Sequence, residues 1–284
     1  MTHTRILASA AEIAPSYDVW LCDVWGVLHN GMRAFAEAHA ACTAFRAAGG
    51  TVVLISNAPR PFDSVARQLD GLGVPRSAYD AIVTSGDVTR SLVTGLQGRP
   101  IYHLGPERDL PVFAGLDARL SGPDSAEAVV CTGLVNDITE TPDDYRQQLR
   151  GFRARALPFI CANPDLVVER GNDVVYCAGA LAAAYEAIGG TVAYAGKPHR
   201  PIYDLAQAAA ERHRAGAVPK SRVLAVGDGL KTDMAGAAAF GIPALFIPSG
   251  VHVTPGRALD NGLIAELFAG AGWRPVAAIG RLEW

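Results

Sequence analysis

The chain has 284 residues, of which 50% are apolar and 19% charged; this length suits about two domains, and the composition excludes intrinsic disorder. Its 25 Lys and Arg residues are offset by 28 Asp and Glu residues, without a basic run that could follow the phosphates of a nucleic acid. No segment approaches the roughly 18 uninterrupted apolar residues of a membrane span. We therefore expect neither nucleic-acid binding nor membrane insertion.

The five cysteines are scattered along the chain without C-x-x-C pairing. In a chain of this length, such cysteines are typical of reduced, buried thiols and of neither a disulfide framework nor a zinc site. Residues 1–20 lack the basic and apolar regions of a secretory signal. These observations predict a cytoplasmic protein.

Short apolar segments alternate along the chain with Ala-rich segments of helical period. This alternation is typical of βα units, and the continuously apolar strands favour a parallel sheet covered on both faces. We predict strands at residues 19–22, 51–55, 81–84, 129–132, 158–162, 191–195, 223–226 and 244–247. We predict helices near residues 35–49, 61–72, 86–95, 142–156, 178–188, 201–214, 232–240 and 258–269.

Two glycine-rich stretches, 95–100 and 189–190, interrupt this pattern and mark crossing points between domains. We therefore predict one domain made of residues 1–95 and 191–284, and a second domain over residues 96–190.

Acidic side chains follow two of the apolar strands. Asp23 comes directly after strand 19–22; since ligands of open α/β sheets bind at the carboxyl ends of strands, it is placed either for chemistry or simply as a turn cap. Asp228 lies at the tip of strand 223–226, and Asp233 begins the next helix. Two carboxylates this close repel each other unless a cation lies between them, and Mg²⁺ is commonly held by such carboxylates.

Polar side chains follow two other strands. Ser56 and Asn57 come after strand 51–55 and precede a helix, which is a pattern of both phosphate binding and plain helix capping. Lys197 stands between Gly196 and Pro198 after strand 191–195. The proline excludes helical geometry at Lys197, and the glycine lets the backbone approach another group closely.

The four segments DVWGVL, ISNAPR, AGKP and VGDGLKTD, in this order, resemble the four signature motifs of the haloacid dehalogenase superfamily. The insertion between the second and third motifs is similar to the class IIA cap of NagD-like sugar and nucleotide phosphatases, with GLVNDIT and CANPD among the matching stretches. The resemblance implies an α/β fold with a Rossmann-like doubly wound parallel sheet core and an inserted α/β cap domain.

The resemblance also implies roles for the motif residues. Asp23 is expected to be the nucleophile that forms an aspartyl-phosphate. Ser56 and Lys197 are expected to hold the transferring phosphoryl oxygens, with Asn57 and Arg60 in the same phosphate-binding set.

For the metal, the resemblance implies Mg²⁺ held by Asp23, the backbone carbonyl of Trp25 and Asp228. Asp233 is expected in the second layer around the ion. The implied substrate is a small phosphate monoester of the sugar or nucleotide type, and we also expect a homodimer formed through the cap.

Trp25 departs from the family pattern, in which a second aspartate two residues after the nucleophile acts as general acid and base. General acid or base catalysis is worth about 10²–10⁴ in rate, so we expect slow hydrolysis of alkyl phosphates. His29 is a candidate substitute by its ordinary pKa, and Asp137 in the insertion is another. Two alternatives stay open: an impaired homologue that binds a phosphorylated metabolite or regulates, and a non-phosphatase hydrolase such as a dehalogenase.

Overall fold

The computed structural model describes residues 4–170, 173–248 and 257–284 of the chain. Its internal contacts group the chain into two compact units. Unit 1 comprises Met1–Ser56, Ala66–Val83 and Tyr203–Trp284, and unit 2 comprises Asn57–Val65 and Thr84–Ile202.

Within its described residues, unit 1 is built on a seven-stranded sheet with the order β1-β14-β13-β12-β2-β3-β4. The strands are β1 (Arg5–Leu7), β2 (Val19–Asp23), β3 (Thr51–Ser56), β4 (Ala81–Thr84), β12 (Val223–Gly227), β13 (Ala244–Phe246) and β14 (Ala277–Ile279). The helices are α1 (Ala36–Ala47), α7 (Ala235–Phe240) and α8 (Asn261–Leu267), while α2 (Phe62–Gly71) and α6 (Arg200–Arg214) each have residues in both units. Neighbouring strands from β1 across to β3 pair in parallel.

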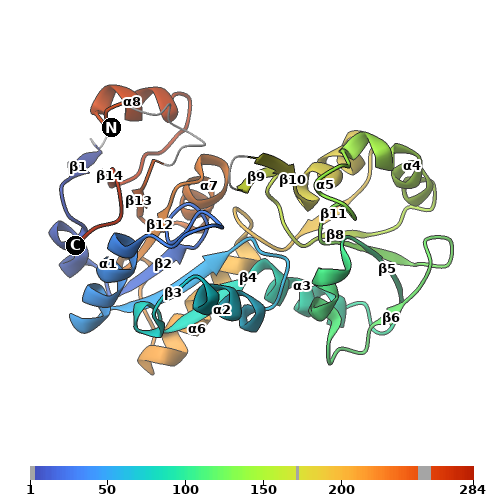
Figure 1. Cartoon of the computed structure of the whole chain (residues 1–284), viewed down its shortest axis with the longest axis horizontal. Coiled ribbons are helices and arrows are strands. Elements are labelled where there is room, and N and C mark those ends of the chain that lie inside the picture. The colour runs from blue at the N-terminus through green and yellow to red at the C-terminus, as the bar shows by residue number, and fades with distance from the viewer. Residues whose placement is uncertain (1–3, 171–172, 249–256) are drawn as a thin grey trace. The chain divides into compact units, whose positions relative to one another are not determined.

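The central strands β2, β3 and β12 are buried along their whole length, as their continuously apolar sequences predict. The chain runs outward from β2 through β3 to β4, and outward in the other direction from β12 to β13 and β14. The strand order therefore reverses between β2 and β12, the kind of position at which open α/β sheets bind ligands. With helices around this sheet (Figure 1), the fold confirms the predicted doubly wound parallel core.

Unit 2 contains, in its described residues, a five-stranded parallel sheet with the order β11-β8-β7-β5-β6 and an antiparallel pair of β9 and β10. The strands are β5 (Pro100–Leu104), β6 (Arg119–Leu120), β7 (Ala128–Cys131), β8 (Phe159–Cys161), β9 (Val167–Arg170), β10 (Asp173–Tyr176) and β11 (Val192–Tyr194). The helices are α3 (Ser85–Thr94), α4 (Arg146–Ala154) and α5 (Ala178–Ala187).

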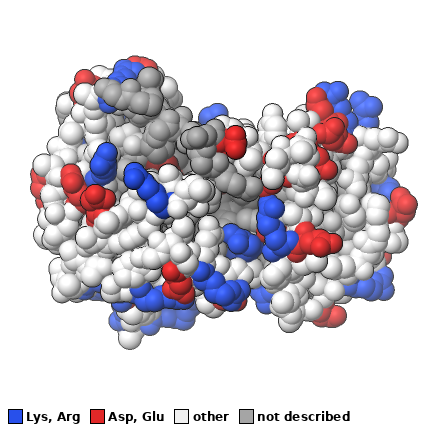
Figure 2. All heavy atoms as spheres, viewed as in Figure 1, with Lys and Arg blue, Asp and Glu red and all other residues white. Residues whose placement is uncertain are grey.

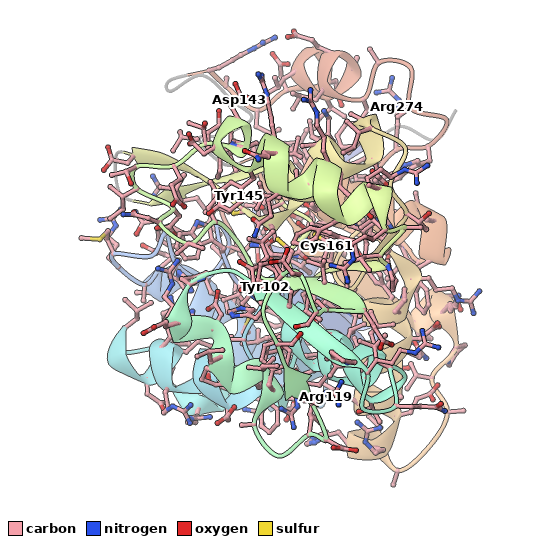
Figure 3. All side chains as sticks on the ribbon, turned by 90° about the vertical axis from the view of Figure 1, so that its right-hand side faces the viewer. Tyr102, Arg119, Asp143, Tyr145, Cys161 and Arg274 are labelled. Atoms are coloured by element: carbon pink, nitrogen blue, oxygen red, sulfur yellow. The ribbon has the colours of Figure 1, made fainter. Side chains whose placement is uncertain are left out.

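Both faces of this sheet are covered, because alternate residues of each strand point to opposite sides. Val130 and Ile160 pack with Val93 of α3 in one cluster of buried side chains. Their strand neighbours Cys131 and Cys161 pack with residues of α4 and α5 in a second cluster. Figure 3 labels Cys161 together with Tyr145 of this second cluster.

Two predicted assignments change with the observed pairing. The sequence predicts residues 191–195 as part of the core domain, but β11 pairs with β8 of the inserted sheet. Helix α3, also placed in the core domain, contributes Val93 to the inserted unit's cluster. A three-residue strand carries no sequence signal for its partner, and an amphipathic helix does not specify which sheet it covers.

The remaining predicted elements are present, and most of them have shifted ends. The helix predicted over 142–156 begins with a 3₁₀ turn, Pro142–Tyr145, before α4. The Asp144 carboxylate accepts hydrogen bonds from the backbone N–H and hydroxyl of Thr141, so the capping residues act at the predicted place. Six strands were not predicted from the sequence: β1, β5, β6, β9, β10 and β14. All but β5 have four residues or fewer, and β5 begins at Pro100, which the sequence assigned to a glycine-rich crossing point between domains.

All five cysteines are buried and free, as predicted. Among the described helices, none has both the length and the apolar character needed to cross a bilayer. On the face shown in Figure 2, acidic and basic side chains are interspersed.

Candidate active site

Three carboxylates meet at the carboxyl edge of the unit 1 sheet. Asp23 is the last residue of β2, and Asp228 follows the last residue of β12; the parallel register of these strands brings both ends to the same edge. One oxygen from each of Asp23, Asp228 and Asp233 lies within 4.8 Å of the other two. The carboxylates predicted at separate positions in the sequence therefore form one cluster, at the reversal of strand order.

Glycines let the backbone pass close to these carboxylates. A Cβ added at Gly26, whose φ is +85°, would lie 2.1 Å from Oδ2 of Asp228. A Cβ added at Gly227 would lie 2.3 Å from Cγ of Asp233. Any larger side chain at either position would displace a carboxylate, so the glycines preserve the shape of the cluster.

Backbone N–H groups orient two of the carboxylates. Asp23 Oδ1 accepts the N–H of Val24 at 2.7 Å, and Asp233 Oδ2 accepts the N–H of Gly229 at 3.2 Å. Asp233 lies in a π-helical turn, Leu230–Met234, and not in the first turn of the predicted α-helix. Such turns are rare in proteins, and those that occur frequently lie at functional sites.

The donor set fits a divalent cation. Asp23 and Asp233 are buried, and like charges at this spacing are unfavourable without a positive charge among them. Carboxylate oxygens are the ligands that Mg²⁺ and Ca²⁺ prefer. The residue types and their close packing are therefore suited to such an ion, and metal binding by these residues stays a prediction.

Ser56 is the buried last residue of β3, one position after Ile55, which pairs with Asp23 on β2. The register thus brings the Ser56 hydroxyl to the same edge as the Asp23 carboxylate. Trp25 lies in the loop after β2, and its ring contacts His29 edge to face with centroids 5.1 Å apart. A Cβ at Gly31 would lie 2.5 Å from the Trp25 ring, so this loop closes tightly around the tryptophan.

His29 is buried, and its Nδ1 accepts the N–H of Gly31 at 2.9 Å. Desolvation, with a smaller contribution from the charge of His39, lowers the pKa of His29 to about 4. A neutral ring that accepts from the backbone favours a structural role in the Trp25 loop. These features do not favour the predicted role of His29 as a substitute general acid or base, which stays a prediction.

Asn57 and Lys197 lie together in unit 2. Lys197 is 2% exposed, which is rare for lysine, and its backbone N–H donates to Oδ1 of Asn57 at 2.7 Å. Gly196 is predicted from the sequence to permit a close approach of another group. The approaching groups are Asn57 Oδ1 and Pro164 Cδ, which would lie 2.4 and 2.7 Å from a Cβ at this glycine.

The other two candidates are also in unit 2. The backbone carbonyl of Arg60 lies against Gly86, and the charge of Arg60 acts on Asp109, a buried carboxyl whose pKa is raised chiefly by desolvation. Asp137 forms an ion pair with Arg108 at 2.6 Å.

Sequence reasoning missed Asp165, whose Oδ1 accepts a hydrogen bond from Asn57 at 2.9 Å. The available signal was the Asn-Pro-Asp sequence directly after a predicted strand, a turn pattern that positions polar side chains at a strand end.

Comparisons with known proteins agree with this geometry. The family model for haloacid dehalogenase-like hydrolases matches residues 20–119, and a second model, described as HAD-hydrolase-like, matches residues 194–261. A crystal structure of a haloacid dehalogenase-like hydrolase from Brucella suis is 47% identical, with 98% of this chain and 100% of that chain covered and a TM-score of 0.87.

A D-glycerol 3-phosphate phosphatase from Mycobacterium tuberculosis is 30% identical over 248 residues, which cover 85% of this chain. The match spans 65% of the length of that curated relative. The crystal structure of a glycerol phosphate phosphatase from the same species, in complex with calcium, is 26% identical with a TM-score of 0.63, over 83% of this chain and 67% of that one.

The matched motif segments, the doubly wound sheet and the carboxylate cluster point to one conclusion. The chain belongs to the haloacid dehalogenase-like hydrolase family.

Proposed function

We propose that this protein is a Mg²⁺-dependent phosphatase that hydrolyses a small phosphate monoester through an aspartyl-phosphate on Asp23. The observation that carries the proposal is the gathering of Asp23, Asp228 and Asp233 at the carboxyl edge of the sheet. The relative from Mycobacterium tuberculosis named as a glycerol phosphate phosphatase, whose structure holds calcium, supports the same chemistry.

In the first step, an Asp23 carboxylate oxygen attacks phosphorus. A new oxygen–phosphorus bond forms, and the bond to the leaving oxygen breaks with its electron pair on that oxygen. Water then attacks the phosphorus of the aspartyl-phosphate, which releases inorganic phosphate and restores the Asp23 carboxylate.

Other side chains stabilise the transferring group. The Ser56 hydroxyl donates to a phosphoryl oxygen, and the Lys197 ammonium offsets the negative charge that the transition state spreads over these oxygens. The Arg60 guanidinium adds a positive charge that binds the phosphate directly or lies at the rim of the phosphate-binding site.

Asp23, the carbonyl of Trp25 and Asp228 would hold Mg²⁺, with Asp233 behind them. A bound divalent cation neutralises charge on the phosphoryl group and orients it. Within the chain itself, Gly26 and Gly227 keep the carboxylates at their close spacing.

Trp25 carries no titratable group, so nothing at this position protonates the leaving oxygen or activates water. An aryl oxide leaves without a proton, whereas an alkyl oxide needs one. We therefore propose that substrates with good leaving groups react faster, by up to the roughly 10²–10⁴ that general acid catalysis supplies.

Trp25 also favours a second candidate function, a homologue that binds a phosphorylated metabolite or becomes phosphorylated on Asp23 without efficient turnover. A metal-independent dehalogenase is disfavoured because both Asp228 and Asp233 are retained. The buried free thiols support a cytoplasmic location, where cysteines stay reduced.

A rapid-mix time course of aryl phosphate cleavage with Mg²⁺, in the native protein and Asp23→Asn, tests the proposal. A burst near one equivalent followed by slow turnover supports phosphorylation of Asp23 with inefficient water attack. Fast linear turnover that depends on Asp23 supports a phosphatase with a substitute base. Absence of Asp23-dependent release across aryl, sugar and nucleotide phosphates would favour the binding function.

A further inference from the structure

The side-chain amide of Asn57 forms hydrogen bonds with both the N–H and the carbonyl group of Lys197. Asn57 Oδ1 accepts the N–H of Lys197 at 2.7 Å, and Asn57 Nδ2 donates to the carbonyl oxygen of Lys197 at 3.2 Å. The two residues are 140 positions apart in the chain. Because one amide bonds both sides of a single residue, it fixes the position and orientation of the Lys197 backbone.

Asp165 favours the same orientation of this amide as the Lys197 backbone does. Its Oδ1 accepts the second Nδ2 hydrogen of Asn57 at 2.9 Å. A flipped amide would turn its oxygen toward both the Asp165 carboxylate and the Lys197 carbonyl, which are acceptors only. Asp165 is itself held by a hydrogen bond from its N–H to Oδ1 of Asn163 at 3.1 Å.

The surroundings of Asn57 and Lys197 are closely packed. A Cβ at Gly196 would lie 2.4 Å from Asn57 Oδ1 and 2.9 Å from Oγ of Ser85. Asn57 and Lys197 are 6% and 2% exposed. Burial raises the strength of these hydrogen bonds and the cost of breaking them.

The hydrogen-bond donors of the Asn57 side chain are fully used. An amide has two N–H donors, and both are given to Lys197 and Asp165. Neither side-chain hydrogen is left for a phosphoryl oxygen, so the amide acts on Lys197 and Asp165. Phosphate binding by Asn57 stays a prediction, and it would use the backbone N–H of this residue.

From this geometry we propose that Asn57 and Asp165 are positioning residues for Lys197, the proposed ligand of the phosphoryl group. Lysine has a flexible stem with considerable rotamer freedom, and a fixed backbone narrows the region that its ammonium can reach. A preorganised cation stabilises a transition state without the cost of being oriented during the reaction. The inference rests on the role given to Lys197 under the proposed function.

The test is a double-mutant cycle with two readouts, the affinity for inorganic phosphate by calorimetry and kcat/KM for an aryl phosphate, both with Mg²⁺ present. We expect Asn57→Ala to weaken each by about 10- to 100-fold, since small misplacements of a catalytic group have effects of this size. In a Lys197→Ala background the same substitution should have little further effect. Asn136→Ala, a truncation of an exposed amide of the same unit whose Oδ1 accepts the N–H of Ile138, serves as control and should change neither readout.

A second set of variants guards against loss of folding. Asn57→Asp places a carboxylate against the Lys197 carbonyl and Asp165, so it should reduce phosphate affinity more than Asp165→Asn does. The combination N57D/D165N restores a donor and acceptor pair between the two side chains. We expect the combination to recover part of the affinity lost in N57D, with a thermal midpoint close to that of D165N.

Equal losses from Asn57→Ala in the native and Lys197→Ala backgrounds would overturn the inference, because a merely structural amide acts without the lysine. Unchanged phosphate affinity in Lys197→Ala would overturn it as well. Failure of the proposed function has a different signature: phosphate binds, the cycle is non-additive, and no Asp23-dependent turnover is found.

Discussion

Acidic side chains have different surroundings at the two ends of the strands of the unit 1 sheet, the carboxyl edge and the amino edge. At the carboxyl edge, Asp23, Asp228 and Asp233 gather with oxygens within 4.8 Å of one another. At the amino edge, Asp18 precedes β2 and Asp80 precedes β4, and each is bonded to basic side chains. Acids matched to bases stabilise a fold, whereas acids gathered together favour a ligand that supplies the positive charge.

At the amino edge, the acidic side chains are bonded to basic groups and to the backbone. Asp80 accepts hydrogen bonds from Arg46 and from the backbone N–H of Val52, and His213 Nε2 lies 3.1 Å from its Oδ1. Arg214 Nη1 donates to the carbonyl oxygens of Asp18 and Gly49. An open groove of about 450 Å³ lies here. Because its ionic side chains bond one another and the backbone, we assign these side chains a structural role.

The largest expected effect contrasts the two acids that flank β2. Asp23→Asn should reduce aryl phosphate hydrolysis by at least about 10³-fold, because the amide is a poor nucleophile. Asp18→Asn, at the amino end of the same strand, should leave kcat/KM within about twofold, since surface ion pairs contribute little. Steady-state kinetics of the two variants check the contrast, and comparable losses in both would show that the edges do not differ in function.

The next effect concerns stability at the amino edge. Asp80→Ala should lower the free energy of unfolding by about 2–4 kcal/mol, because Arg46 and Val52 lose the acceptor of their hydrogen bonds. Urea denaturation measures this change. Asp70→Ala is the matched control: its pair with Arg76 is exposed, and we expect a loss below about 1 kcal/mol. A control loss as large as that of Asp80→Ala would refute the distinction.

At the carboxyl edge, neutralising an acid should have the opposite sign. Without metal, Asp228→Asn is expected to raise the free energy of unfolding by about 1 kcal/mol, because it relieves repulsion among the three carboxylates. With Mg²⁺ at about 100 times its Kd, the native protein should gain about 2.7 kcal/mol and the variant much less. Thermal unfolding with and without Mg²⁺ measures both; a variant less stable than the native metal-free protein would contradict the repulsion.

The smallest effect is a pH dependence at the amino edge. The hydrogen-bonded Arg222 guanidinium lowers the pKa of Asp18 from its ordinary 3.8. A carboxyl with a lowered pKa in the folded state stabilises the protein fully above its unfolded pKa, and this stabilisation is lost as the pH falls through the folded pKa. The difference in stability between native protein and Asp18→Asn should therefore be about 0.5–1 kcal/mol at pH 6 and shrink below about pH 4. Unfolding curves across this range check it, and a constant difference would argue against the ion pair.

Much of the fold and of the candidate site could be predicted from the sequence. The buried strands β2, β3 and β12 were identified because an unbroken apolar run of strand length has few other solutions in a βα pattern. Asp23 and Asp228 were assigned to strand ends for the same reason. Strands β6 and β14 were not predicted, because two or three residues carry too little pattern to indicate a strand.

The sequence by itself determined which residues carry chemical groups and where strands end, since apolar runs and the residues that follow them are local properties. Only the tertiary structure decided which groups meet. The register of β12 on β2 brings Asp228 to Asp23, and the pairing of β11 with β8 places strand 191–195 in unit 2. The amide of Asn57 forms a hydrogen bond with Lys197, which is 140 positions away in the chain. Backbone hydrogen-bonding groups are the same in every residue, and a side-chain amide bonds whatever the fold places beside it, so these partners are fixed by packing of the whole chain and by no local pattern.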